Sequence, residues 1–382
     1  MTNFDASSTK RLGIPSGEIR HPQASTRGQR LDSAQPLTKT KNSNIVVIGI
    51  SGCSSSGKTT LTFLLDEIFN SGAVTTTGKH IIMQDDFFRP KSELPDVVFV
   101  EQDTKFLKAT IQQGTSQLYD IQPFIDEKMK TAWKITGPDA DCAAAVNFDM
   151  LSKAVVHLRR NGEIPEELEA QRKAKQLGVV QGRTVTSNDN QAVQRNKVSY
   201  LNHDESMLRQ MYGSLIQELR RKVKTSLDKM TGNLRFVFVE GFLLFKDPGS
   251  TAVTTQDRHR QTLQSCIDIP LFVTTSRVEA KNRRLSRKTY LDPPLGERLP
   301  GQMWKGEGYF EDVVWNGYIA ESGWLLNRLS SGKEDRSREK IQGIWVRSKD
   351  QSVEETLRWG VETILQDMWA GSISSPTTRS NT

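Results

Sequence analysis

The sequence predicts an α/β protein with a doubly wound parallel sheet of five strands flanked by helices. Two observations support this fold class. Short apolar runs of strand length alternate with longer segments whose apolar residues recur at helical spacing. The first apolar run leads directly into a glycine-rich loop, and an amphipathic helix follows that loop. This alternation is typical of parallel strands joined by helices.

The individual elements follow from the same patterns. Helical faces are predicted within residues 61–68, 207–223 and 353–368. Ser352, with Glu355 three residues later, predicts a capping box at the start of the last helix. The expected strands are residues 45–50, 80–83, 236–239, 267–273 and 344–346.

Composition divides the chain into one large domain with polar ends. Residues 1–43 and the tail 371–382 have little apolar clustering, so both are expected to be disordered. Residues 44–370 are long enough to bury a core and are expected to form the folded domain.

Composition also limits the class of protein. No apolar run approaches the length of about 18 residues that a membrane span needs, and the first residues lack the apolar stretch of a secretory signal. We therefore expect a cytoplasmic protein without a membrane partner. Cys53, Cys142 and Cys266 lie far apart, which argues against a disulfide framework or a zinc site. A net charge of +7 would suit nucleic acid, but we favour phosphate-handling residues plus basic tails and expect no nucleic-acid partner.

Residues 52–59, GCSSSGKT, match the spacing G-x-x-x-x-G-K-[ST] in full. Gly52 and Gly57 allow the backbone to curl so that successive N–H groups point inward at phosphate oxygens. The N-terminus of the following helix faces the same anion. Lys58 can reach the β- and γ-phosphates, and the Thr59 hydroxyl can ligate magnesium. The motif predicts a P-loop NTPase that binds a nucleotide.

Two acidic residues follow predicted strands. Asp85 comes after the second strand, in the run QDDFFRP of residues 84–90, and Glu240 ends the third strand. Because ligands gather at the carboxyl ends of parallel strands, both acids are expected beside the phosphate loop. Asp85 is the candidate base for an acceptor hydroxyl, and Glu240 is expected to assist magnesium. Phe87 or Phe88 would form the wall of an acceptor pocket; the alternative is a solvated acid beside two core phenylalanines.

Residues 281–288, KNRRLSRK, carry five positive charges and follow the fourth strand. Such a run can be a localisation signal, a nucleic-acid patch or a solvated helix face. At this position, arginines on a mobile lid can neutralise the charge that builds on a transferring phosphoryl group. We therefore expect a lid segment here.

With these segments together, the chain resembles the nicotinamide riboside kinases, within the uridine-kinase-like group of P-loop small-molecule kinases. The matching motifs are GISGCSSSGKTTL, QDDFFRP, VEGFLLF, KNRRLSRKTY and GYFEDVVWNGY. They cover residues 45–94 and 234–368 of the chain. The connection GQMWKGEGYFEDVVW is similar to that of the fungal branch.

The resemblance implies an ATP- and Mg²⁺-dependent kinase that phosphorylates the ribose 5′-hydroxyl of nicotinamide riboside, a step of NAD salvage. We expect it to act as a monomer or weak homodimer. The expected ATP-binding residues are Gly52, Cys53, Ser54, Ser55, Ser56, Gly57, Lys58, Thr59, Thr60, Arg283 and Arg287. The expected substrate-binding residues are Asp85, Asp86, Phe87, Phe88, Asp141, Arg284 and Tyr290. The expected magnesium ligands are Thr59, Asp85 and Glu240, and the expected catalytic residues are Lys58, Asp85 and Arg284.

Two parts of the chain depart from the family pattern. Where the family has an aromatic residue followed by Asp, this chain has Ala140 and Asp141, with alanine in place of the ring. Residues 95–140 and 160–203 are expected to be insertions, and the second includes a charged helical piece at residues 165–176. Because the acceptor site is built from these divergent parts, the acceptor stays open.

Three functions therefore remain. The first is phosphorylation of nicotinamide riboside, whose cationic pyridinium would suit the carboxylates of Asp85 and Asp86. The second keeps the chemistry but takes uridine, cytidine or another small alcohol as acceptor. The third is a nucleotide-binding protein whose altered acceptor pocket has lost turnover.

Overall fold

The described part of the chain belongs to one of its two units, Lys41–Thr382, in the computed structural model. The predicted N-terminal extension, residues 1–43, lies outside the described residues. The described ranges are 44–70, 80–101, 120–125, 131–176, 205–230, 234–250, 254–287, 305–330, 339–347 and 351–373.

A six-stranded sheet forms the centre of this unit, in the order β2-β6-β1-β7-β9-β8. The first five strands are parallel and lie at the five predicted positions. The sixth, β8, was not predicted, because its three residues Glu339–Ile341 include a single apolar side chain; it pairs antiparallel with β9. The strands are β1 (Ile45–Gly52), β2 (Ile81–Met83), β6 (Arg235–Gly241), β7 (Ile269–Val273), β8 (Glu339–Ile341) and β9 (Ile344–Arg347).

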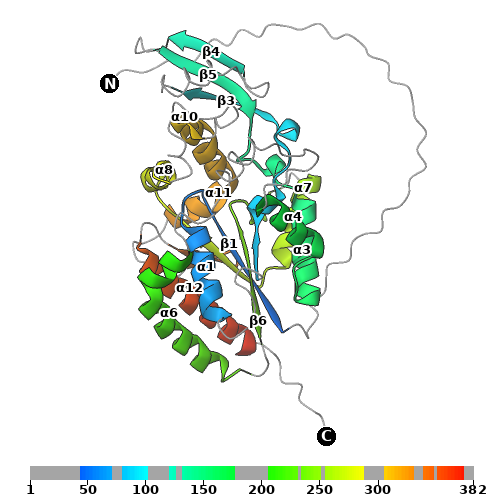
Figure 1. Ribbon diagram of the computed structural model, residues 1–382, viewed down its shortest axis with the longest axis vertical. Helices are drawn as coiled ribbons and strands as arrows, with labels where there is room; N and C mark the ends of the chain where they lie inside the picture. Colours follow the sequence, from blue (N-terminus) through cyan, green and yellow to red (C-terminus); the bar gives the residue numbers. More distant parts are fainter. Residues whose placement is uncertain are drawn as a thin grey trace, which may run out of the picture. The chain divides into compact units, whose positions relative to one another are not determined.

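Helices cover both faces of this sheet, with α1, α6 and α12 on one side and α3, α4 and α7 on the other (Figure 1). The predicted capping box is present: Ser352 Oγ accepts from Glu355 N over 3.2 Å, and Ser352 N donates to Glu355 Oε2 over 2.8 Å. The helix it opens, α12, continues to Ile373. None of the described helices is long and apolar enough to cross a membrane. The helices are α1 (Lys58–Phe69), α3 (Phe148–Asn161), α4 (Glu166–Gln176), α6 (Glu205–Leu227), α7 (Thr255–Ser265), α8 (Arg277–Leu285), α11 (Trp315–Ser330) and α12 (Val353–Ile373).

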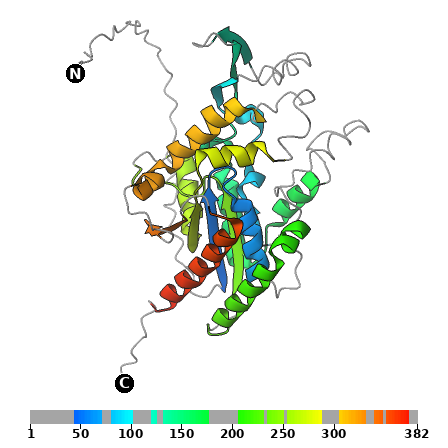
Figure 2. The same cartoon turned by 90° about the vertical axis from the view of Figure 1, so that its left-hand side faces the viewer.

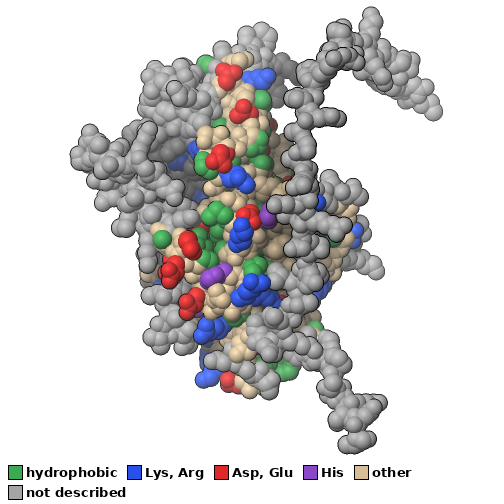
Figure 3. Space-filling view, turned by 90° about the vertical axis from the view of Figure 1, so that its right-hand side faces the viewer, with side chains coloured by type: hydrophobic (Ala, Val, Ile, Leu, Met, Phe, Trp, Pro, Cys, Tyr) green, Lys and Arg blue, Asp and Glu red, His purple; other side chains and the backbone are tan. Residues whose placement is uncertain are grey.

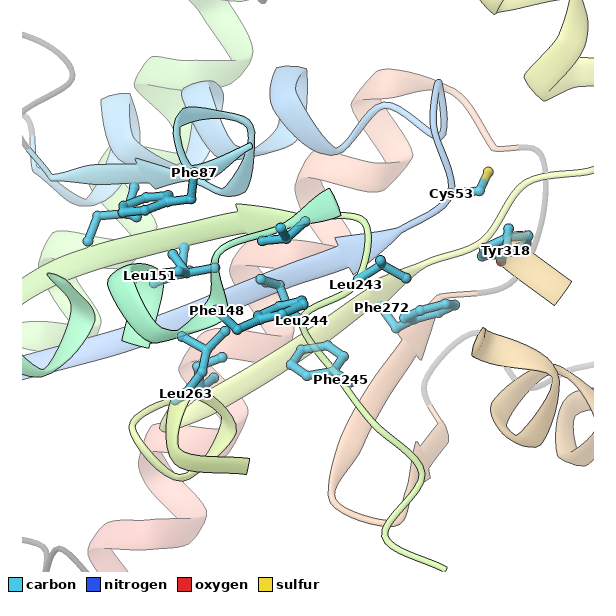
Figure 4. Packing of buried hydrophobic residues seen from close by; sticks show 14 of the residues in the cluster. Cys53, Phe87, Phe148, Leu151, Leu243, Leu244, Phe245, Leu263, Phe272 and Tyr318 are labelled. Atoms are coloured by element: carbon cyan, nitrogen blue, oxygen red, sulfur yellow. The ribbon is translucent and has the colours of Figure 1, made fainter. Parts of the chain in front are cut away.

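Two apolar clusters hold the layers together, one on each face. Side chains alternate along a strand, so Phe236 and Phe238 enter one cluster, whereas Val237 and Val239 enter the other. Because both faces are covered, the central strands are continuously apolar, which is what made them recognisable in the sequence. We name the cluster on the α3 and α7 side cluster A. Figure 4 shows part of it, including Phe87, Phe148, Leu151, Leu243, Leu244 and Leu263.

A second, three-stranded antiparallel sheet lies within the predicted insertion at residues 95–140, in the order β3-β5-β4. It packs on two short helical turns, α10 and η6 (a π-helix), through a 3.1 Å hydrogen bond from Gly308 N to Glu101 Oε2. A Cβ at Gly308 would lie 1.8 Å from the carbonyl oxygen of Val100, so this contact requires glycine. Figure 2 shows the small sheet beyond α10 and α11. These elements are β3 (Asp96–Glu101), β4 (Asp120–Ile125), β5 (Thr131–Pro138), α10 (Glu307–Tyr309) and η6 (Phe310–Val314).

Three short 3₁₀ turns complete the described elements, and the first of them carries the acidic motif that follows β2. They are η1 (Gln84–Phe87), η2 (Lys91–Glu93) and η3 (Ala143–Ala145).

Candidate active site

The loop between β1 and α1 has the backbone that its glycines predict. Gly52, Ser55 and Gly57 have φ values of 149°, 68° and 94°, and Ser56 N donates to the carbonyl oxygen of Cys53 over 3.2 Å. A Cβ at Gly52 would lie 2.2 Å from the carbonyl oxygen of Val273, so only glycine fits there. The loop therefore curls tightly at the carboxyl end of β1.

The start of α1 leaves backbone N–H groups available to an anion. Gly57 caps the helix without a side-chain hydrogen bond, and the first turn contains no acidic residue. Helix N-termini of this kind attract phosphate, because unsatisfied N–H groups and the helix dipole point the same way. Lys58 is buried in the first turn; its Nζ donates to Cys53 O over 2.8 Å and lies 3.9 Å from Oε1 of Glu240.

Glu240 is the second-last residue of β6 and lies beside this loop. In the sheet it pairs with Ile50 of β1 and with Met83 of β2, so the ends of three adjacent strands meet at this residue. The pKa of Glu240 is raised to about 7: burial and the charge of Asp85 raise it, while Lys58 and a hydrogen bond with the Thr59 side chain oppose the shift. Glu240 is thus a buried acid held between a lysine, a threonine hydroxyl and a second acid.

The side chains of the motif QDDFF point in three directions, because η1 is a 3₁₀ turn with about three residues per turn. Gln84 and Phe87 point inward and are buried; Gln84 Oε1 accepts from Leu243 N over 3.1 Å, and Phe87 belongs to cluster A (Figure 4). Asp85 and Phe88, one turn apart, are both exposed. Asp86 points in a third direction, toward α4.

Asp85 is accessible to solvent, yet surrounding protein removes part of its hydration. This desolvation raises the pKa of Asp85, Asp86 and Asp141 raise it further, and Lys58 and Arg287 lower it. The structure therefore brings Asp85, Glu240, Lys58 and Arg287 within electrostatic reach of one another.

The other residues of the motif have different surroundings. The Asp86 carboxylate is 3% exposed and accepts a 2.9 Å hydrogen bond from Nε of Arg172. Phe87 lies in the core, so the structure does not bring it to the surface of the site. Phe88 is 40% exposed and stacks on Phe242, with ring centroids 6.0 Å apart. Of the four residues of this motif that were expected to bind the substrate, only Asp85 and Phe88 face outward.

The described part of the basic run, residues 281–287, lies in α8 and directly after it, and its charged side chains have different partners. Lys281 pairs with Glu307 and Glu311, which raises the pKa of Lys281, and Arg283 pairs with Glu279 over 2.6 Å. Lys281 thus faces the turns α10 and η6. Arg283 pairs within α8, and its charge, like that of Arg287, acts on Cys53 of the phosphate loop.

Arg284 is buried, and its Nη1 donates to Oγ of Ser54 over 2.9 Å. Arg287 lies near enough to Asp85 and Glu240 to lower the pKa of both. Arg284, expected to contact the acceptor, therefore lies on the loop expected to bind ATP. Tyr290, the remaining expected residue of this segment, lies outside the described residues.

Residues 139–142 lie close to the same acids. Asp141 raises the pKa of Asp85 by charge repulsion, and its own backbone N–H donates to Asp139 Oδ1 over 2.9 Å. The Ala140 amide donates to the hydroxyl of Tyr309 over 3.1 Å. Tyr309 is fully buried, and burial, with a contribution from Asp141, raises the pKa of its hydroxyl. The alanine at position 140 thus packs beside a ring from α10, but this ring is not exposed.

The residues present fit a magnesium ion bound with a nucleotide. Thr59, Asp85 and Glu240 offer hard oxygen ligands, and Mg²⁺ in such sites takes one or two carboxylates plus phosphate oxygens and water. The charge of Asp85 raises the pKa of Glu240, so the two carboxylates lie close enough for one cation to act on both. Within the described ranges no group of three or more His, Cys, Asp and Glu side chains forms a self-sufficient metal site.

Sequence reasoning missed Arg172 and Phe242. Arg172 is one of many charges on a polar helix, and nothing in its spacing singles it out. Phe242 stands in the motif VEGFLLF, and its position directly after Gly241 at a strand end was the available signal.

Comparison with known proteins gives two similar chains. No protein-family model matches the chain. It is 22% identical over 321 residues to a nicotinamide riboside kinase of Schizosaccharomyces pombe and 21% identical over 330 residues to one of Saccharomyces cerevisiae. Each alignment covers 84% of this chain and 96% of the relative. The similarity extends well beyond the two motif-bearing segments identified in the sequence.

Proposed function

We propose that this chain is a P-loop kinase that transfers the γ-phosphoryl group of ATP to the 5′-hydroxyl of nicotinamide riboside, giving nicotinamide mononucleotide and ADP. One observation carries the proposal. Lys58, Thr59, Glu240 and Asp85 converge at the ends of the adjacent strands β1, β6 and β2, beside a loop that only glycine-rich sequence can form. The similarity to two nicotinamide riboside kinases supports the choice of acceptor.

The phosphate side binds and orients ATP. Backbone N–H groups of residues 52–59 and the N-terminus of α1 would bind the phosphates, as described above. Lys58 is already held in place through Cys53 O, so it loses little freedom on binding. Arg284 and Arg287 stabilise the negative charge on the transferring group. Thr59, Asp85 and Glu240 would hold Mg²⁺, which would supply positive charge to neutralise part of the phosphate charge.

The acceptor side would activate the hydroxyl. Asp85 takes the proton of the 5′-hydroxyl as the new O–P bond forms, while the bond between the γ-phosphorus and the bridging oxygen breaks and ADP leaves. In the protein without bound metal, desolvation raises the pKa of Asp85 above that of an ordinary aspartate, which favours its taking a proton. Its exposure leaves the carboxylate accessible to a hydroxyl.

Two features favour a flat cationic acceptor. Phe88 and Phe242 form an accessible stacked pair one turn from Asp85, and aromatic faces bind planar rings. Asp141 adds a second negative charge near Asp85. A pyridinium ring gains from both, whereas neutral uracil gains only from stacking.

A nucleic-acid substrate is not supported. Of the basic run, Lys281 and Arg283 pair with acids and Arg284 binds the phosphate loop. Among the described residues of the face in Figure 3, basic and acidic side chains are interspersed.

Release of ADP from the purified full chain tests the proposal. ATP, Mg²⁺ and nicotinamide riboside together should give ADP at a rate that omission of the riboside abolishes, and Asp85→Asn should lower kcat by about 10²- to 10⁴-fold. Direct competition between nicotinamide riboside and uridine identifies the preferred acceptor. Preference for uridine would favour the second function. Binding of ATP without turnover of either riboside would favour a protein that has lost catalysis, for which Ala140 in the ring position is the motivating feature.

A further inference from the structure

Arg172 connects helix α4 to the turn that carries Asp85. Its Nε donates to Oδ2 of Asp86 over 2.9 Å, and its Nη2 donates to the carbonyl oxygen of Ile81 over 2.8 Å. Ile81 opens strand β2, and Asp86 lies in η1. One guanidinium therefore spans both ends of the segment in which Asp85 lies.

The packing of α4 directs Arg172 to this place. Ile164, just before the helix, and Leu168 within it are buried in cluster A, which also contains Phe87. Leu168 and Arg172 are four residues apart, so they project from the same face of α4. Docking of Leu168 in the core thus turns Arg172 toward β2, where its side chain is 22% exposed.

The contact with Ile81 provides a hydrogen-bond donor for a backbone carbonyl at the outer edge of the sheet. β2 is the outermost strand, and the carbonyl oxygen of His80 accepts from Phe238 N of β6. Successive carbonyl groups along a strand point in opposite directions, so the carbonyl of Ile81 points away from β6. A buried carbonyl there needs another donor, and the guanidinium of Arg172 provides it.

The contact with Asp86 compensates a buried charge. The Asp86 carboxylate is 3% exposed, and an unpaired acid at that burial would be strongly unfavourable. The planar guanidinium of arginine can donate to two acceptors at once, which the single ammonium of lysine cannot do in the same geometry. The strand end and the turn are therefore held as one unit.

We infer that Arg172 is a positioning residue for Asp85: by fixing the end of β2 and the η1 turn together, it sets the direction of the carboxylate that accepts the proton. The inference rests on the proposed function. It also assigns Asp86 to the support of this turn instead of to contact with the acceptor. Its charge is compensated inside the protein, so Asp86→Asn should affect nicotinamide riboside and uridine equally.

Two substitutions of Arg172 in the full chain test this. Arg172→Met should lower kcat for nicotinamide riboside by about 100-fold, because small misplacements of a catalytic group have effects of that size, with the KM for ATP unchanged. Arg172→Lys retains the charge opposite Asp86 but loses the planar guanidinium that donates to both acceptors. Its kcat should therefore lie between those of Arg172→Met and the wild type. Arg209→Met is the matched control, because Arg209 pairs with Glu67 on α1, away from β2.

A second measurement does not depend on activity. Hydrogen exchange followed by mass spectrometry should show faster exchange at residues 81–89 in Arg172→Met, with α1 unchanged. If the wild-type chain shows no turnover of any riboside, the proposed function fails and this exchange result alone decides on the role of Arg172.

Two results would overturn the inference. One is unchanged exchange at residues 81–89 in Arg172→Met. The other is a folded Arg172→Met protein with kcat within about twofold of wild type, which would reduce the contact to a structural ion pair. If Arg172→Met does not fold, Arg172→Lys answers the same question. Loss of the two-acceptor guanidinium contact alone must then lower kcat without raising the KM for ATP.

Discussion

The phosphate side and the acceptor side of the candidate site are built in different ways. The phosphate side comes from one continuous stretch, β1, the loop and α1, with Glu240 from the neighbouring strand β6. The acceptor side combines η1, residues 139–142 and the residue after Gly241, and an arginine from α4 supports it. Local sequence can specify the first side almost completely, whereas the second depends on packing between distant segments.

Among the changes that separate the two sides, the largest effect is expected on the phosphate side. Lys58→Met should lower kcat by about 10²- to 10³-fold, as loss of a preorganised group that stabilises transition-state charge does, and by the same factor for every acceptor. Parallel assays with nicotinamide riboside and uridine measure this. Lys222→Met is the control, because Lys222 pairs with Glu362 on the surface. A loss confined to one acceptor would show that the two sides are not separable.

The next effect is the pH dependence of the free energy of unfolding, which we attribute to Glu240, where the two sides of the site meet. Because the folded-state pKa of Glu240 is raised to about 7, the folded protein binds more protons than the unfolded chain between the two pKa values. The metal-free protein should therefore lose stability as pH rises from about 4.5 to 7, on the order of 1–3 kcal/mol. Thermal unfolding at several pH values measures the slope. Glu240→Gln should flatten it, and an unchanged slope in that variant would assign it to other groups.

A smaller effect is expected on the acceptor side. Phe242→Ala should raise the KM for nicotinamide riboside by about tenfold and leave the KM for ATP unchanged, because one face of the stacked pair is lost. Phe242→Leu retains the apolar volume but not the ring, so it separates stacking from packing. Trp369→Ala, at an exposed ring on α12, is the control. Equal increases in both KM values would contradict the assignment of this pair to the acceptor.

The smallest expected effect is on stability, with no change in either side of the candidate site. Thr254 caps α7 in a capping box with Asp257. Thr254→Ala should reduce the free energy of unfolding by about 1 kcal/mol, because one capped N–H loses its acceptor, while kcat stays at the wild-type value. Denaturant titration and steady-state kinetics on the same preparation check both parts. A change in kcat would reveal coupling between α7 and the site.

The strands and the phosphate loop were predictable because each is encoded locally. Continuous apolar runs identified the five parallel strands, and the positions of Gly52 and Gly57 specified a loop that no other residue type could form at Gly52. β8 escaped prediction, since Glu339 and Lys340 contribute nothing apolar to it. The motif QDDFF identified Asp85 but did not show in which direction each of its side chains points. Those directions depend on the 3₁₀ turn and on the elements packed around it.

By itself, the sequence determined the alternation of strands and helices, the phosphate loop and the acids at the strand ends, because spacing along the chain suffices for each of them. Only the tertiary structure decided that Asp86 pairs with Arg172, that Phe87 is buried while Phe88 stacks on Phe242, and that Arg284 rests on Ser54. The physical reason is that these contacts join residues on separate elements. Their partners are selected by how α4, α8 and β6 pack, and no local pattern records that choice.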